Sequence, residues 1–180
     1  MKASDNAVLA WQATLLVAML GLLLVACRSQ IEVASAPVQV AVDTASLVVQ
    51  VRAAADADDV LLIEPLRDTQ TEDLRQAAQQ LERQGDYRGA LQRLQQAQEI
   101  SPNDPALLQE AAEMALYLAD WDQAIALASR SFDNGPRLGP LCRRNWVTVQ
   151  LVREQVGDSA GSASAQAQRI QCTVSAPVRM

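Results

Sequence analysis

The chain repeats itself with a period of 34 residues, and this repeat constrains the fold more than any other feature. A fixed period of this length indicates stacked units that bury their apolar faces against their neighbours. Aromatic residues make up only 3% of the chain, so the core must consist mainly of Ala, Leu and Val, which favours closely packed helices over a β-sandwich. The pairs that match at this offset include Leu74/Leu108, Ala77/Ala111, Ala78/Ala112, Asp86/Asp120, Tyr87/Trp121, Ala90/Ala124 and Pro102/Pro136.

The period and its small residues resemble the tetratricopeptide repeat (TPR). When repeats are counted from Thr71 and Pro105, the small residues of the family's pattern fall on Ala78, Ala90, Ala112 and Ala124, and its proline falls on Pro102 and Pro136. The resemblance implies two antiparallel helices in each repeat.

Local signals place the helix ends within each repeat. Thr69 to Glu72 have the spacing of a capping box, and Gly85-Asp86 ends one helix and caps the next. Asp104-Pro105 combines a cap with a proline at the first helical position, Asp120 caps the following helix, and Gly135-Pro136 ends it. We therefore predict helices at about 71–84, 87–100, 105–118 and 121–134.

A third unit follows and departs from the pattern. We predict a longer helix over 141–156, a turn at Gly157-Asp158 and a last helix to about Gln171. This degenerate repeat would cap the array, as terminal repeats do. The predicted fold is an all-α TPR solenoid over residues 69–172, with about six helices, followed by a tail at 173–180.

Residues 1–26 have the length and apolar run of a secretory signal peptide, which is too short to span a bilayer comfortably. The run ends in Leu24-Val25-Ala26-Cys27, which resembles the lipobox of bacterial lipoproteins. The resemblance implies lipidation of Cys27, palmitate included, and cleavage before it. Arg28 in place of Asp implies sorting to the outer membrane, with the domain in the periplasm. The alternative is an uncleaved anchor with an incidental cysteine.

Residues 27–68 are interpreted as a largely irregular linker. The alternation at 38–42 and the strand-like run at 47–51 could pair as a weak hairpin across Asp43 to Ser46. The alternative is a disordered spacer with apolar patches, of which Val60 to Ile63 is one that could dock onto the domain or a partner.

Cys142 and Cys172 begin the fifth predicted helix and end the sixth. These ends are neighbours in an antiparallel pair, and the compartment that the lipobox implies is oxidising. We therefore expect a Cys142–Cys172 disulfide, with two free thiols as the alternative.

Composition excludes several functions. The net charge of −6 argues against a nucleic-acid partner. The chain has no His, and its only Lys is Lys2 in the predicted signal, so most catalytic and metal-binding repertoires are missing. Asp56, Asp58 and Asp59 lack the glycine and distal glutamate of a calcium loop and are interpreted as solvated linker. We predict no enzyme activity, no cofactor and no metal.

TPR arrays bind peptides or proteins in a groove lined by the first helix of each repeat. The corresponding positions are Arg75, Gln79, Glu82, Arg83, Gln109, Glu113, Leu116, Tyr117, Arg143, Val147 and Gln150. The alternative for any one of them is an ordinary solvated helix face. The Lys/Asn set with which some TPR domains clamp a carboxylate is not reproduced.

A lipid anchor, a spacer and a short TPR domain resemble the envelope lipoproteins that activate bifunctional penicillin-binding proteins. The predicted function is a membrane-anchored periplasmic scaffold that binds an envelope protein or peptide, with such a peptidoglycan synthase as the specific candidate. A pilotin-like role in pilus or secretion assembly is the alternative, and an enzyme is the remote one.

Overall fold

The computed structural model describes residues 42–55 and 66–173, which all belong to one compact unit. The predicted signal peptide, Cys27, the apolar run at 60–63 and most of the tail lie outside the described residues. The described helices are α2 (Thr44–Ala53), α3 (Thr69–Arg83), α4 (Tyr87–Ile100), α5 (Pro105–Tyr117), α6 (Trp121–Asn134), α7 (Pro140–Gln155) and α8 (Ser159–Gln171).

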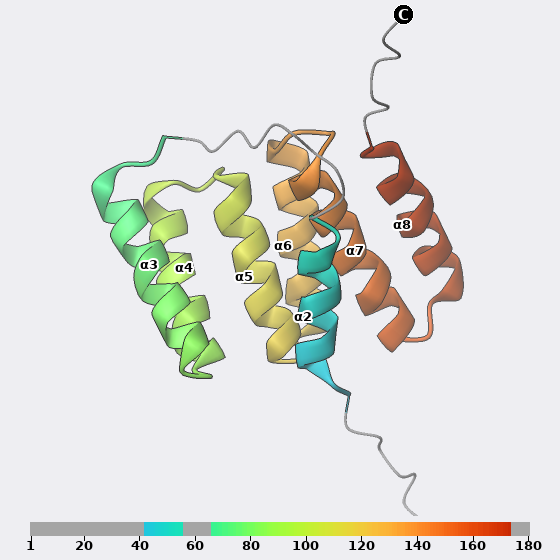
Figure 1. Cartoon of the computed structure of the whole chain (residues 1–180), viewed down its shortest axis with the longest axis horizontal. Coiled ribbons are helices and arrows are strands. Elements are labelled where there is room, and N and C mark those ends of the chain that lie inside the picture. Colours follow the sequence, from blue (N-terminus) through green and yellow to red (C-terminus); the bar gives the residue numbers. More distant parts are fainter. Residues whose placement is uncertain (1–41, 56–65, 174–180) are drawn as a thin grey trace, which may run out of the picture. The chain divides into compact units, whose positions relative to one another are not determined.

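Six of these helices form three antiparallel pairs in a row, and α2 lies against α5 and α7 (Figure 1). The pairs are α3 with α4, α5 with α6, and α7 with α8, and each pair packs on the next through α4–α5 and α6–α7. The predicted all-α solenoid of two regular repeats and a degenerate third is confirmed, and among the described helices α2 is additional to the six predicted.

Small residues let the helices of a pair approach closely. Ala90, Ala112 and Ala124 are fully buried, and Ala78 is 3% exposed. An Ala side chain lets two backbones approach closely without leaving a cavity. Near the turns, the rings of Tyr87 and Tyr117 stack with their centroids 3.9 Å apart and join α4 to α5.

Aspartates cap most of the helices. Asp86, Asp120 and Asp158 each accept a hydrogen bond from the backbone N–H three residues later, which satisfies one free donor of the first turn. The capping box predicted at Thr69 to Glu72 is wrong: the cap is Asp68, whose carboxylate accepts from the Thr71 N–H at 2.9 Å.

The turn inside each repeat contains one residue in the left-handed backbone conformation, at the same position of the turn. It is Gly85 in the first repeat (φ 78°), Ala119 in the second (φ 55°) and Gly157 in the third (φ 76°). The next N–H reaches back five residues, as in Asp86 N–H to the Leu81 carbonyl at 2.9 Å, so the three turns share one hydrogen-bond pattern.

The strand-like interpretation of residues 47–51 is wrong, because this segment forms α2. Asp43 does not begin a hairpin turn but caps the helix, and its side chain accepts from the Ser46 N–H at 3.1 Å. Leu47, Val48 and Val51 share one face of α2 and are buried. Burial on the repeat domain therefore outweighs the β preference of the valines.

Candidate partner-binding groove

The groove predicted along the first helices of the repeats is filled in part by α2. The apolar face of α2 packs against α5 and α7 in one cluster with Leu116, Val147 and Leu151. At the other end of the segment, the Thr44 hydroxyl donates to the Tyr117 carbonyl oxygen at 3.2 Å. A segment expected to be linker thus occupies the place where the family resemblance puts a ligand.

A buried carboxylate joins α2 to the repeats. Glu113 is fully buried, and its Oε2 accepts from Arg52 Nε at 2.8 Å. Arg52 also pairs with Glu82 at 2.8 Å, and Arg144 of α7 donates to the other oxygen of Glu113 through Nε at 3.0 Å. Burial alone would lower the pKa of Arg52, but its hydrogen bonds and charge pairing with Glu82 and Glu113 raise it instead, so the guanidinium stays charged.

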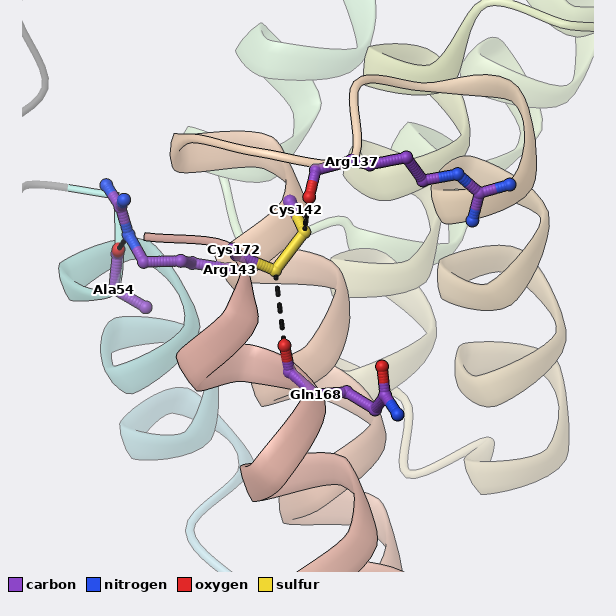
Figure 2. The surroundings of a disulfide bond; sticks show 6 residues. All are labelled: Ala54, Arg137, Cys142, Arg143, Gln168 and Cys172. Atoms are coloured by element: carbon purple, nitrogen blue, oxygen red, sulfur yellow. Dashed lines mark hydrogen bonds between the residues drawn. A yellow bond between two sulfur atoms is a disulfide. The ribbon is translucent and has the colours of Figure 1, made fainter. Parts of the chain in front are cut away.

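Arg143 caps the carboxyl end of α2. Its Nε donates to the Ala54 carbonyl at 2.7 Å (Figure 2). Its guanidinium also donates to the Ala55 carbonyl at 3.1 Å. A cation at the last carbonyls of a helix satisfies free acceptors and opposes the negative end of the helix dipole. The side chain that we predicted for partner contact therefore holds the chain's own helix.

The structure divides the predicted groove residues into two sets. Five of them are at most 5% exposed and so do not face an open groove: Gln109, Glu113, Leu116, Arg143 and Val147. A second set keeps accessible surface: Arg75, Gln79, Glu82, Arg83, Tyr117 and Gln150. Contact with a partner remains a prediction for both sets.

What stays open is a pocket of about 410 Å³ between α2 and the first two repeats, bordered by α7. Its lining contains both arginine and glutamate side chains, together with one glutamine and one alanine. The lining residues are Arg52, Ala55, Gln79, Glu82, Arg83, Glu110 and Arg144. Arg83 is exposed and makes no ion pair within the described part of the chain.

This surface also includes Arg52, Glu110 and Arg144, which the repeat pattern did not predict. Arg52 was assigned to the linker, and only the docking of α2 brings it beside Glu82. Glu110 pairs with Arg75 at 2.8 Å. It directly follows Gln109, so it lies one position away from the groove positions predicted for this helix. Within the described residues, no group of three or more metal-ligating side chains occurs.

A disulfide joins Cys142 at the start of α7 to Cys172 at the end of α8, with an S–S distance of 2.00 Å (Figure 2). Beside it, the Gly139 N–H donates to the Cys172 carbonyl at 2.8 Å. Both contacts hold the open ends of α7 and α8 together, next to the Arg143 side chain that caps α2.

Comparisons with known proteins agree with this architecture. The tetratricopeptide repeat family model matches residues 71–114. The solved structure of the globular C-terminal domain of P. aeruginosa LpoP is similar with a TM-score of 0.55 and 30% identity, over 58% of this chain and 99% of that one. The chain belongs to the tetratricopeptide-repeat family that includes LpoP. A search of curated proteins found no match.

The helix pairs of the described residues are therefore a tetratricopeptide-repeat domain. The LpoP domain corresponds to somewhat more than half of this chain. None of the described helices is both long and apolar enough to cross a membrane.

Proposed function

We propose that this chain is an outer-membrane lipoprotein whose TPR domain binds and activates a bifunctional penicillin-binding protein in the periplasm. The observation that carries the proposal is the charged pocket built jointly by α2 and the first helices of the repeats, on a domain of the LpoP family. The lipobox ending at Cys27 and the layout of anchor, spacer and short TPR domain support it.

The pocket beside α2 is the proposed contact surface. Arg83 and Gln79 on α3 offer hydrogen-bond donors that make no ion pair with any other described residue, whereas Arg52 and Arg144 are already paired with Glu113. A partner side chain that enters the pocket would therefore form its first hydrogen bonds with Arg83 and Gln79 of α3. Because α2 fills the rest of the groove, the partner contacts a composite of α2 and α3 rather than the whole array.

A synthesis assay tests the proposal. The full lipoprotein in detergent is mixed with the organism's purified bifunctional penicillin-binding protein and lipid-linked precursor, and glycan polymerisation is measured. We expect stimulation, and an Arg83→Glu variant should lose at least half of it. Arg88→Glu, the same charge change at an exposed position of α4, is the matched control and should keep it. Failure of the unmodified chain to bind or stimulate any such synthase would reject the proposal.

The lipid anchor is tested separately. Cells are fed an alkyne-labelled palmitate, and the chain is recovered and stained for the label. We expect labelling that is lost in a Cys27→Ser variant, with the normal chain in the outer-membrane fraction. Unlabelled, unprocessed protein would reject the lipobox interpretation, while the synthase contact could still stand.

A further inference from the structure

The helix α2 stands between the proposed lipid anchor and the repeats in the chain, so its docking decides how much chain separates the two. While α2 is docked, only the residues between Cys27 and Thr44 can extend from the anchor. At about 3.5 Å per residue they span at most about 60 Å, whatever their conformation. When α2 is detached, the chain can extend as far as Thr69, and the limit becomes about 150 Å. The docking of α2 therefore sets the maximum reach of the repeats.

The repeats keep a core of their own without α2. The larger cluster of buried apolar side chains runs through the helices α3 to α8 and includes no residue of α2. The buried side chains of α2 belong to a second cluster, where they pack mainly against α5 and α7 (Figure 1). The disulfide and the three helix pairs also involve only the repeats. The array can therefore stay folded when α2 leaves it.

The apolar contacts that hold α2 are limited. Leu47, Val48 and Val51 are its buried side chains, in a helix of 10 residues. A helix of this length is unstable on its own in water, because its first turn is costly to nucleate and few hydrogen bonds follow. The conformational entropy lost by its backbone offsets much of what three buried side chains contribute. Segments with few buried contacts open before the core against which they pack, so α2 should detach before the repeats unfold.

The polar contacts of α2 can open without leaving a buried charge alone. Glu113 would lose Arg52, but it keeps Arg144, whose Nε donates to Oε1 at 3.0 Å. The side-chain amide of Gln109 donates to the same oxygen at 3.2 Å. Arg52 is already 44% exposed and returns to water when α2 detaches. The release of α2 therefore avoids the large penalty of an uncompensated buried carboxylate.

We propose that α2 is a releasable helix whose docking limits how far the repeat domain can stand from its lipid anchor. Docked α2 keeps the attachment point within about 60 Å of Cys27, and its release moves that point to Thr69, up to about 150 Å away. The inference rests on the proposed function in taking Cys27 as the anchor. Because the charged pocket includes Arg52 and Ala55, only the docked form presents the complete pocket. A partner bound there would therefore favour the short-reach form.

Pulling single molecules with optical tweezers tests the release of α2. The full chain is made without lipid, oxidised and held in detergent micelles, with one DNA handle on the Cys27 thiol and one at the carboxyl terminus. Cys142 and Cys172 are bonded to each other and 1% exposed, so the first handle reacts only with Cys27. We expect a reversible first step of at most about 90 Å, the extended length of residues 44–68, at a lower force than the steps of the repeats. A single step that opens α2 and the repeats together would overturn the proposal.

Two valines of α2 provide matched variants for this measurement. Val51 is fully buried, and Val49 is 65% exposed. Val51→Ala should raise the rate of the first step at a given force about tenfold, because it removes buried methyl groups from the docked face. It should leave the later steps unchanged, which shows that the repeats still fold. Val49→Ala should leave every step unchanged, and equal first steps in the two variants would overturn the assignment of that step to α2.

The pulling experiment separates this inference from the proposed function, because neither a lipid nor a synthase is present. If the first step is absent while the chain still stimulates the synthase, the release of α2 is wrong and the proposed function stands. A first step from α2 together with palmitate on Cys27 in cells supports the proposal. If the step occurs but Cys27 carries no lipid in cells, α2 sets no distance from a membrane, and this inference falls with the anchor.

Discussion

Arg52 and Glu113 depend on each other, although 61 positions separate them in the chain. Glu113 is fully buried, and the Arg52 guanidinium of α2 lies 2.8 Å from its carboxylate. A buried carboxylate without sufficient cationic partners is strongly unfavourable. Arg52 of α2 and Arg144 of α7 together balance the charge of Glu113, and the Arg52–Glu113 pair also holds α2 in place.

Replacing Arg52 with Met tests this dependence, because Met keeps an apolar stem and removes the charge. Arg144 still pairs with Glu113, so we expect a loss of about 1–3 kcal/mol in the free energy of unfolding, below the cost of leaving a buried charge alone. Urea unfolding followed by circular dichroism measures it. Arg88→Met on α4 is the control and should change stability by less than about 0.5 kcal/mol. Equal effects of the two variants would show that the pair contributes nothing.

Adjacent valines of α2 give a matched test of its docking. Val48 is fully buried and Val49 is 65% exposed. Val48→Ala should destabilise the docked helix by about 1–3 kcal/mol, whereas Val49→Ala should have little effect. Amide hydrogen exchange in α2 reports it: exchange should speed up only in the Val48 variant. Comparable exchange in both variants would mean that α2 does not pack through this face.

The repeat domain could be predicted closely because its signals are local or periodic. The Ala positions, the Gly85-Asp86 turn and Asp104-Pro105 are all readable in the sequence, and the observed helices α4 and α6 agree with the predicted ranges to the residue. The third repeat followed from one more Gly-Asp turn at Gly157.

The groove could not be predicted, because its occupant is set by long-range contacts. Residues 47–51 carry a run of β-branched side chains that favours a strand by local preference. Only burial against Leu116 and Val147, together with the pairing of Arg52 and Glu113, makes a helix the better solution. Nothing near Arg143 in the sequence indicates that it caps α2.

The left-handed turn of the second repeat is a site for stabilisation. Ala119 has φ 55° where the other two repeats have glycine. A residue with a Cβ is destabilised by about 1–2 kcal/mol in the left-handed conformation, and glycine avoids this strain. Glycine also makes the unfolded chain more flexible, which offsets about 0.5–1 kcal/mol of the gain. Ala119→Gly should therefore raise stability by about 0.5–1 kcal/mol, seen as a higher melting temperature. Gly85→Ala, the reciprocal change at the equivalent position of the first repeat, should lower the melting temperature. A lower melting temperature for Ala119→Gly, or a higher one for Gly85→Ala, would contradict the assignment.

The Arg75–Glu110 pair predicts a dependence of stability on pH. Burial raises the pKa of the Glu110 carboxyl above its usual value of 4.5, and Arg75, which lies 2.8 Å away, opposes part of that rise. An acid whose folded-state pKa is raised loses stability as pH increases from the unfolded value through the folded one. Arg75→Met removes the opposing charge and should widen this window.

Urea unfolding of Arg75→Met between pH 4 and pH 8 measures the effect. We expect a small difference from the unmodified chain near pH 4, where Glu110 is protonated, that grows to about 1–3 kcal/mol at pH 7. Arg83→Met, at an exposed position of the same helix, should give no such slope. A cost for Arg75→Met that is the same at every pH would mean that Glu110 is not its source.

The Cys142–Cys172 bridge should stabilise the third repeat and, through Arg143, the docking of α2. The cysteines are 30 positions apart, so in the chain-entropy view the cross-link contributes about 3–4 kcal/mol by restricting the unfolded chain. Replacing both cysteines with Ser should lower the unfolding free energy by about that amount and speed hydrogen exchange first in α8.

Arg143 is the neighbour of Cys142 and caps Ala54, so exchange at the end of α2 should also increase. Mass mapping without reductant checks the bridge itself; two alkylatable thiols in the mature protein would contradict it. Faster exchange in α8 with no change in α2 would confine the role of the bridge to the third repeat.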